Sequence, residues 1–179
     1  MKKQSGFTIV ELVIVITIMA ILVAIAIPSF QQLMMTNRLA SATNDLMGSL
    51  NLARSEAIRR GAWVNVGAAG ANWKGGWRVY VDANRNGAFN AGVDEELRIM
   101  QPVMPNMANF TVLGSAGVAT LVSFRPDGTA RDAAGGLQAG TVRVCYPMLV
   151  PENARNIRIA PGGRLTSDRV TVADCTVGP

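Results

Sequence analysis

The hydrophobic pattern begins with one long apolar stretch near the N-terminus. Residues 9–27 are 19 positions that carry a single charge, Glu11. A helix needs about 20 apolar residues to cross the hydrocarbon core of a bilayer, so we expect a transmembrane helix over 7–28. Lys2 and Lys3 come before it. By the positive-inside rule, the start of the chain then lies in the cytoplasm and the rest lies on the far side of the membrane.

After this stretch the pattern stays helical but becomes amphipathic. Five apolar residues recur at spacings of seven, four, three and four positions: Leu39, Leu46, Leu50, Ala53 and Ala57. These spacings put them on one face of a helix. The other side is polar: Arg38, Asn44, Asn51 and Arg59. Gly61 is a typical residue at the end of a helix, so we expect 29–61 to form the second half of one long helix, with its apolar face covering a sheet.

The rest of the chain, 62–179, alternates short apolar or β-rich runs with turn signals. The runs are 62–67, 77–81, 97–101, 109–113, 120–125, 141–146, 156–160 and 168–173. The turn signals are Gly75-Gly76, Asn86-Gly87, Asp127-Gly128, Gly135-Gly136 and Gly162-Gly163. Together they predict an antiparallel β head packed on the helix, and therefore an α+β fold.

Three interpretations of the N-terminus compete: a cleaved secretory signal, a plain membrane anchor and a prepilin leader. Ala24-Ile25-Ala26 has the small residues of a secretory cleavage site. The apolar run, however, is longer than the usual 7 to 15 residues of a signal core, and it contains Glu11. A plain anchor explains the length but leaves that carboxylate below the membrane surface, where it costs about 2 to 3 kcal/mol without a partner.

Residues 2–12 read Lys-Lys-Gln-Ser-Gly-Phe-Thr-Ile-Val-Glu-Leu and closely resemble the type IV prepilin motif. In that family a membrane-embedded prepilin peptidase cuts after the glycine and methylates the new N-terminal amine. The resemblance implies a cleaved leader over 1–6, cleavage between Gly6 and Phe7, and a methylated Phe7. It also implies that Glu11 attracts the Phe7 amine of a neighbouring subunit in a growing filament. The alternative is that Glu11 only reaches the cytoplasmic interface.

A second motif narrows the family. Residues 50–60, Leu-Asn-Leu-Ala-Arg-Ser-Glu-Ala-Ile-Arg-Arg, resemble the pseudopilin H of type II secretion and the FimT-type minor pilins. Further segments follow in the order that this group shows: Gly76 to Asp82, Phe124 to Gly128 and Ile159 to Leu165. The resemblance covers nearly the whole chain. It implies a pilin fold, a single pass through the bacterial inner membrane, a periplasmic head, and contacts with prepilin peptidase, other pilins or pseudopilins, and inner-membrane lipid.

The two cysteines, Cys145 and Cys175, both follow the apolar segment and so lie on the far side of the membrane. Because that compartment is oxidising, we expect a disulfide between them. The alternative is a pair of reduced, buried thiols.

Composition limits the chemistry that the head can perform. The chain has no histidine, which excludes a nucleophile activated by imidazole and a histidine zinc site. Nothing resembles a phosphate loop, a redox motif or a pair of catalytic carboxylates. We expect no catalytic residues, no cofactor, and therefore no enzyme.

One segment of the head resembles the opening of a calcium loop: Asp82, Asn84, Asn86 and Gly87. The match fails at the twelfth position, which is Val93 rather than glutamate, and Arg85 adds a repelling charge. We expect a hairpin turn and no metal site.

The C-terminal part of the head is rich in arginine, with Arg143, Arg155, Arg158, Arg164 and Arg169. Some FimT-type minor pilins bind DNA through a C-terminal Gly-Arg-x-Arg motif, and Gly163-Arg164 matches its start, but Thr166 stands where the second arginine belongs. The candidate DNA-binding residues are Arg158, Arg164 and Arg169, if a turn brings the last one close. Exposed arginines on strands are also common without such a role, and the net charge of +5 is mild.

Three tryptophans and three methionines could mark a binding surface, but packing is the simpler interpretation: Trp63, Trp73, Trp77, Met100, Met104 and Met107. We expect a minor subunit that assembles into a type IV pilus or a type II secretion pseudopilus, in a complex at the filament tip. The alternative is a minor pilin that binds DNA for uptake in natural transformation.

Overall fold

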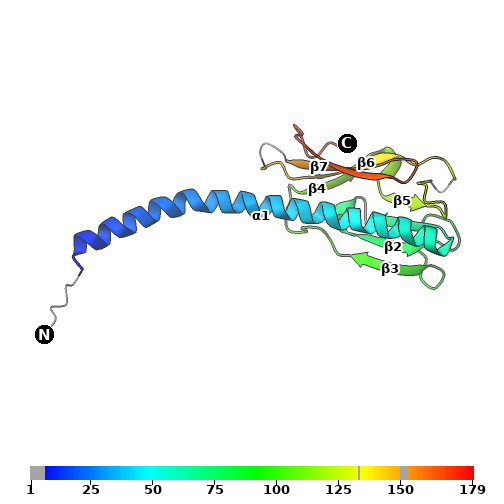
Figure 1. Ribbon diagram of the computed structural model, residues 1–179, viewed down its shortest axis with the longest axis horizontal. Helices are drawn as coiled ribbons and strands as arrows, with labels where there is room; N and C mark the ends of the chain where they lie inside the picture. Colours follow the sequence, from blue (N-terminus) through cyan, green and yellow to red (C-terminus); the bar gives the residue numbers. More distant parts are fainter. Residues whose placement is uncertain (1–6, 133, 150–152) are drawn as a thin grey trace. The chain divides into compact units, whose positions relative to one another are not determined.

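Residues 7–132, 134–149 and 153–179 are described by the computed structural model of the chain (Figure 1). The chain forms two compact units, one up to Asn37 and one from Arg38 to Pro179. A single helix, α1 (Ile9–Arg60), contributes to both units, and Pro28 lies inside it.

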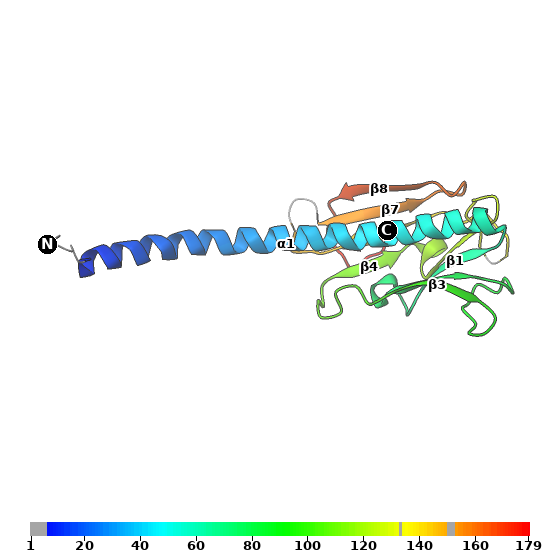
Figure 2. The same cartoon turned by 60° about the horizontal axis from the view of Figure 1, so that its bottom comes forward.

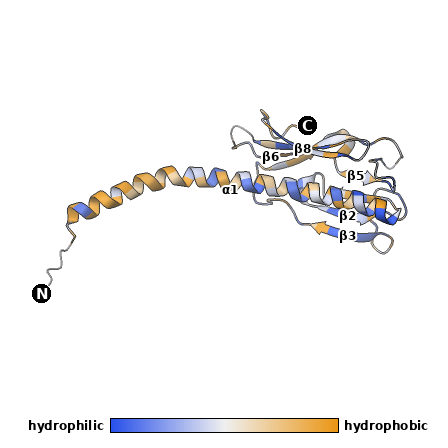
Figure 3. Cartoon of the chain, in the orientation of Figure 1, coloured by the Kyte–Doolittle hydropathy of each residue, from blue (hydrophilic) through white to orange (hydrophobic). Residues whose placement is uncertain are grey.

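The first unit holds the apolar part of α1. Its large apolar side chains are exposed along its length, for example Ile14 at 52% and Leu22 at 62%. Figure 3 shows this part of the ribbon in the colour of hydrophobic residues. Because α1 is long and apolar enough to cross a membrane, and this stretch is not covered by protein, its surface is suited to lipid or to other helices.

The second part of α1 has the amphipathic pattern that the sequence predicted. All five apolar positions are buried: Leu39, Leu46, Leu50, Ala53 and Ala57. The four polar positions are exposed: Arg38, Asn44, Asn51 and Arg59. Gly61 ends the helix with a φ of 63°, in the left-handed region that glycine adopts easily.

The head contains two four-stranded antiparallel sheets. The first has the order β3-β2-β1-β5, with β3 (Glu95–Met100), β2 (Trp77–Val81), β1 (Val64–Ala68) and β5 (Leu121–Phe124). The second has the order β4-β6-β7-β8, with β4 (Thr111–Gly114), β6 (Gly140–Cys145), β7 (Ala154–Ile159) and β8 (Leu165–Val170). Two short 3-10 turns, Trp73–Gly75 and Ala116–Val118, lie in the connections.

Each of the eight runs expected from the sequence becomes a strand, with bounds that differ by at most three residues. The expectation that the helix covers one sheet was incomplete. The chain leaves the first sheet after β3, adds β4 to the second, returns for β5 and then completes the second sheet. These exchanges depend on which strands pair across the fold, which the alternation within a single strand does not specify.

The hydrophobic core of the head lies between α1 and the inner faces of the two sheets. Figure 1 and Figure 2 show strands on both sides of the Arg38–Arg60 part of α1. Val66 and Val79 from the first sheet and Val144 and Ile157 from the second are all almost fully buried. The helix therefore acts as the common support of both sheets.

The expected disulfide between Cys145 and Cys175 is present, with the two Cα atoms 5.5 Å apart. It packs against Ala154, Val170 and Val172. The bond therefore fixes the C-terminal segment to β6 and covers one end of the second sheet.

Replacing Cys145 with serine is expected to lower the free energy of unfolding by about 3 to 4 kcal/mol, because the bond closes a loop with a sequence separation of 30 residues. Denaturant unfolding of the full chain in detergent measures this loss. Cys175→Ser and the double variant should lose no more than the single variant, since each removes the same bond. Unchanged midpoints in all three variants would contradict the prediction.

Candidate assembly site

The first turn of α1 is closed by a reciprocal pair of side chains. Thr8 Oγ1 accepts a hydrogen bond from the Glu11 backbone amide at 3.2 Å. Glu11 Oε2 in turn accepts from the Thr8 amide at 3.0 Å and from the Thr8 hydroxyl at 2.9 Å. This is a capping box, which satisfies backbone donors that the start of a helix leaves without partners. The Glu11 carboxylate is thus held at the N-terminal, positive end of the helix dipole.

From the sequence, a role was expected for Glu11 but none for Thr8. The sequence did contain a pattern that predicts a role for Thr8, because Thr-Ile-Val-Glu before an apolar run has the spacing of a capping box. In the described part of the chain, Glu11 Oε1 accepts no hydrogen bond, so this oxygen can take a donor from outside the subunit. The assembly role of Glu11 itself stays a prediction.

The expected cleavage position lies beside this cap. Gly6 falls outside the described residues. Phe7, the expected first residue of the mature chain, is 79% exposed, so its side chain is not enclosed by its own subunit. A neighbouring subunit can therefore reach it.

Three separate motifs of the head meet at Arg54 on α1. Its Nε donates to the Gly128 carbonyl at 3.1 Å, and its Nη2 donates to the Gly162 carbonyl at 3.4 Å. The first carbonyl belongs to the turn after β5 and the second to the turn between β7 and β8. The Ala130 amide also donates to the Pro161 carbonyl at 2.9 Å, which joins the same two turns. The motif arginine therefore ties the helix to a turn from each sheet.

The basic residues at the end of α1 are also structural. Glu56 pairs with Arg59 and, at 2.6 Å, with Arg60, and Arg60 also reaches Glu95 at 2.5 Å. Hydrogen bonds from Arg59 and then Arg60 lower the pKa of the Glu56 carboxyl. This network connects the last turn of α1 to β3.

The loop that resembles a calcium site is a hairpin between β2 and β3, as the sequence predicted. Asp82 Oδ1 accepts from the Asn86 amide at 3.2 Å, and Oδ2 accepts from the Gly87 amide at 2.8 Å. Asp94 likewise accepts from two backbone amides of the loop. Over the described residues, no group of three or more metal-ligating side chains is found. The two carboxylates therefore stabilise the turn by accepting hydrogen bonds from its backbone amides.

The three candidate DNA-binding arginines do not form one cluster. Arg158 is exposed, and its guanidinium pairs with Asp168 at 3.1 and 3.2 Å. Arg164 is exposed in the turn between β7 and β8. Arg169 lies opposite Arg155 in the strand register, and strand residues three apart point to opposite faces. Arg169 therefore lies on the face of the sheet opposite to Arg158.

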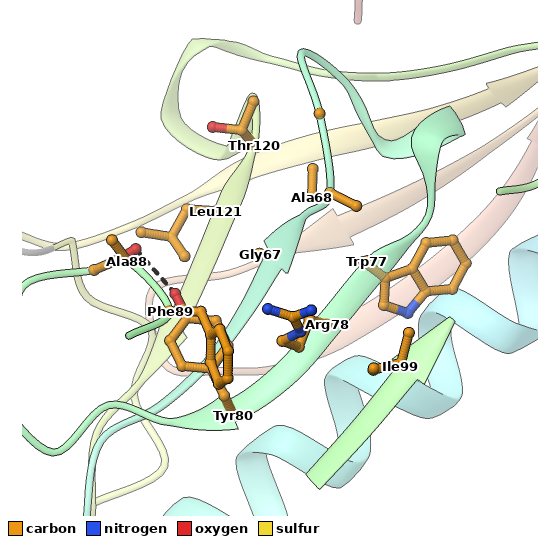
Figure 4. A pocket seen from close by; sticks show the side chains of 13 residues that line it. Gly67, Ala68, Trp77, Arg78, Tyr80, Ala88, Phe89, Ile99, Thr120 and Leu121 are labelled. Atoms are coloured by element: carbon orange, nitrogen blue, oxygen red, sulfur yellow. Dashed lines mark hydrogen bonds between the residues drawn. The ribbon is translucent and has the colours of Figure 1, made fainter. Parts of the chain in front are cut away.

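A cavity of about 520 Å³ on the first sheet lies among β1, β2, β3 and β5 (Figure 4). The Arg78 guanidinium stacks on Phe89 at 4.1 Å, and its Nε is 2.6 Å from Glu96. The Tyr80 hydroxyl donates to the Gly87 carbonyl at 3.0 Å, and burial raises the pKa of Tyr80. The Tyr80 hydroxyl thus has its partner within the fold, and the Arg78 guanidinium lies between Phe89 and Glu96.

The aromatic residues pack as the sequence predicted. Trp73 and Trp77 are almost fully buried, and the Trp73 indole donates to the Val118 carbonyl at 3.0 Å. Trp63 is half-buried beneath Arg125, whose guanidinium carbon is 5.5 Å from the ring centroid. These side chains stabilise the head and do not form a joint surface.

Two family models match the chain. The model described as type II transport protein GspH matches residues 42–163, and the prokaryotic N-terminal methylation motif matches residues 1–27. The Pilin-like protein PilA1 of Thermus thermophilus is 38% identical over 93 residues, which are 50% of this chain and 55% of that protein. A fimbrial protein of Pseudomonas aeruginosa is 41% identical over 61 residues, 34% of this chain and 39% of that protein. The chain thus spans about half or less of the length of these curated relatives.

Solved structures of one protein resemble the fold. A crystal structure of the type IV minor pilin FimU of Pseudomonas aeruginosa PAO1 superposes with a TM-score of 0.59 at 22% identity, over 78% of this chain and 96% of that chain. A second crystal form gives a TM-score of 0.56 at 20% identity, over 76% and 99% of the two chains. At these identities the likeness shows the fold, a long helix with antiparallel sheets.

Proposed function

Because the chain belongs to the family of the type II transport protein GspH, we propose that it is a minor subunit of a type IV pilus or of a type II secretion pseudopilus. It acts by assembling with other pilins or pseudopilins in the complex at the filament tip. The single observation that carries this proposal is the first turn of α1, where an exposed Phe7 precedes a capped Glu11 with one open carboxylate oxygen.

The charge of the Glu11 carboxylate in that turn favours assembly of the subunit. A carboxylate below the membrane surface is costly unless it is paired. The capping box satisfies Oε2 while the subunit is alone, and the Phe7 amine of a neighbour supplies a positive charge for Oε1 once both chains have lost residues 1–6. Assembly then neutralises two charges in an apolar helix bundle.

The location follows from the same segment. Prepilin peptidase cleaves between Gly6 and Phe7 and methylates the new amine while residues 7–28 lie in inner-membrane lipid. The head, including its disulfide, lies in the periplasm, where thiols oxidise. Upon assembly the apolar part of α1 exchanges lipid contacts for contacts with other helices.

The head supports a structural role better than catalysis or DNA binding. Its motif residues, Arg54 above all, hold elements of the fold together. Arg158 is neutralised by Asp168, and Arg169 lies on the opposite face of the sheet. A phosphate backbone that contacts Arg164 would therefore gain little electrostatic attraction from Arg158 or Arg169.

Two experiments test the proposal. Mass spectrometry of the chain purified from membranes should find an N-methylated Phe7 as the first residue. A chain that begins at Ile27 would indicate a secretory signal, and one that keeps residues 1–6 would indicate a plain anchor.

A deletion strain then separates the two machines. Loss of pili or of transformation with normal release of secreted proteins identifies the pilus, and the reverse identifies the secretion pseudopilus. Normal function of both would overturn the proposal.

A further inference from the structure

One end of the head is formed by the start of its helix and by three loop segments, and we call it the near end. Thr111, Cys145, Ala154 and Val170 are neighbours across β4, β6, β7 and β8. The chain segments that adjoin them therefore lie at the same end of the second sheet: 101–110, 146–149 and 171–179. The first of these segments also forms a groove of about 500 Å³ beside residues 38–45 of α1. The near end thus surrounds the point where α1 enters the head.

The near end is poor in charge and carries exposed apolar side chains. Over its three segments and residues 150–152, the sequence has two charged residues, Glu152 and Asp174. The loops at the other end, where α1 finishes, have eight over 82–94, 125–139 and 160–164. At the near end, Met148 is 67% exposed and Val177 is 60% exposed. Exposed apolar surface of this kind marks a contact with another protein or with a membrane.

The length of α1 places Arg38 at the membrane surface. Beyond the 19-residue apolar run, large apolar side chains stay exposed at Phe30, Leu33 and Met34, by 63%, 55% and 38%. The apolar surface of α1 therefore extends to Met34, and a stretch longer than the hydrocarbon core is accommodated by tilting. Arg38 follows four residues later in the same helix, about 6 Å further along it. The headgroup layer is about 5 to 8 Å thick, so Arg38 lies at its level.

The charge of Arg38 favours lipid over protein as the partner of the near end. Its side chain is exposed, and in the described part of the chain no ion pair involves it. A guanidinium forms charge-assisted hydrogen bonds with phosphate, often two in parallel. A phospholipid headgroup layer therefore supplies the counter-ion that Arg38 lacks, next to apolar groups that Met148 and Val177 can contact.

We propose that the near end of the head rests on the headgroup layer of the membrane that α1 spans, as long as the subunit is outside a filament. Arg38 binds lipid phosphate, and Met148 and Val177 lie among the headgroups. Because lipid then contacts the loops as well as α1, the head keeps one orientation before assembly. The inference rests on the membrane span in the proposed function.

Lipid quenching of a single fluorophore tests the contact. The full chain is reconstituted at low density in vesicles of phosphatidylcholine and phosphatidylglycerol that include lipids with a nitroxide on the headgroup. The fluorophore is attached to Met148→Cys, while Cys145 and Cys175 stay joined and do not react. Its fluorescence should be strongly quenched. In the matched control the label is on Val93→Cys, which is 56% exposed in the hairpin that Arg60 of α1 contacts, so it should keep its intensity.

Substitutions at the near end identify lipid as the occupant. In a chain labelled at Val177→Cys, Met148→Asp should restore most of the lost fluorescence, because a carboxylate is costly to place in lipid. Met148→Leu should leave the quenching unchanged, and Arg38→Glu should reduce it. Equal intensity of the labels at positions 148 and 93 would overturn the inference. So would a label at position 148 that is shielded from water but not quenched, which would indicate a neighbouring subunit.

A label in the apolar part of α1 separates two kinds of failure. The fluorophore is attached to Ile21→Cys, and the nitroxide is placed on the lipid acyl chain. If this label is quenched while the label at position 148 is not, the chain spans the membrane and only the contact of the near end is wrong. If the label at position 21 is not quenched, the membrane span and the proposed function are wrong as well.

Discussion

Replacing Glu11 with glutamine is expected to leave the subunit processed and inserted in the membrane but to remove it from filaments. Glutamine can still close the capping box, because this position accepts either residue. It cannot neutralise the Phe7 amine of a neighbour. An unpaired charge in an apolar bundle costs about 3 to 5 kcal/mol, which lowers the equilibrium for adding a subunit on the order of a hundredfold or more.

The measurement compares the amount of chain in sheared filaments with the amount in membranes. Thr8→Ala is the matched control, since it removes the cap and keeps the charge. Losing a cap costs about 1 kcal/mol, so this variant should still assemble, at a reduced level. Recovery of Glu11→Gln in filaments at the level of the unmodified chain would show that the carboxylate charge is not needed.

Replacing Gly163 with alanine is expected to disrupt the head. Gly163 has a φ of 74°, and a Cβ at this position would lie 1.9 Å from the Gly128 carbonyl oxygen and 2.9 Å from Arg54 Nε. The substitution forces the two turns apart and breaks the hydrogen bonds of Arg54. Left-handed strain, overpacking and the lost charged hydrogen bonds together amount to about 4 to 6 kcal/mol.

The neighbouring glycine provides the control. A Cβ at Gly162 would meet nothing within 4 Å, so Gly162→Ala should change the free energy of unfolding by less than about 1 kcal/mol. Denaturant unfolding of both variants in detergent measures the difference. Equal stabilities would mean that the turns can separate without cost and that Arg54 does not tie them together.

Much of the fold could be predicted because it depends on local patterns. The spacing from Leu39 to Ala57 marked the buried face of α1, Gly61 marked its end, and the alternating runs marked all eight strands. The cap is local in the same sense, because Thr8 and Glu11 are three residues apart and their residue types alone give the pattern of a capping box.

The remaining features depend on contacts between distant parts of the chain. Arg54 donates to carbonyl groups that lie 74 and 108 positions further along the chain. Every residue has a backbone carbonyl, so no residue type in the sequence identifies these two acceptors. Arg158 is exposed and its strand neighbours Ile157 and Ile159 are buried, which alternation along one strand is enough to account for. That Arg169 lies on the opposite face follows only from the register of β8 against β7. The division into two sheets likewise depends on pairing.

The disulfide also has a mechanical consequence. It joins β6 to a cysteine 30 positions further along the chain, and β7 and β8 lie inside the loop that it closes. If a filament is pulled and its head begins to unravel, tension passes from Cys145 to Cys175 through the sulfur atoms. About 100 Å of extended chain is then withheld from stretching. With the disulfide formed, the unravelled head therefore reaches a shorter maximum extension than the same number of residues would reach without the bond.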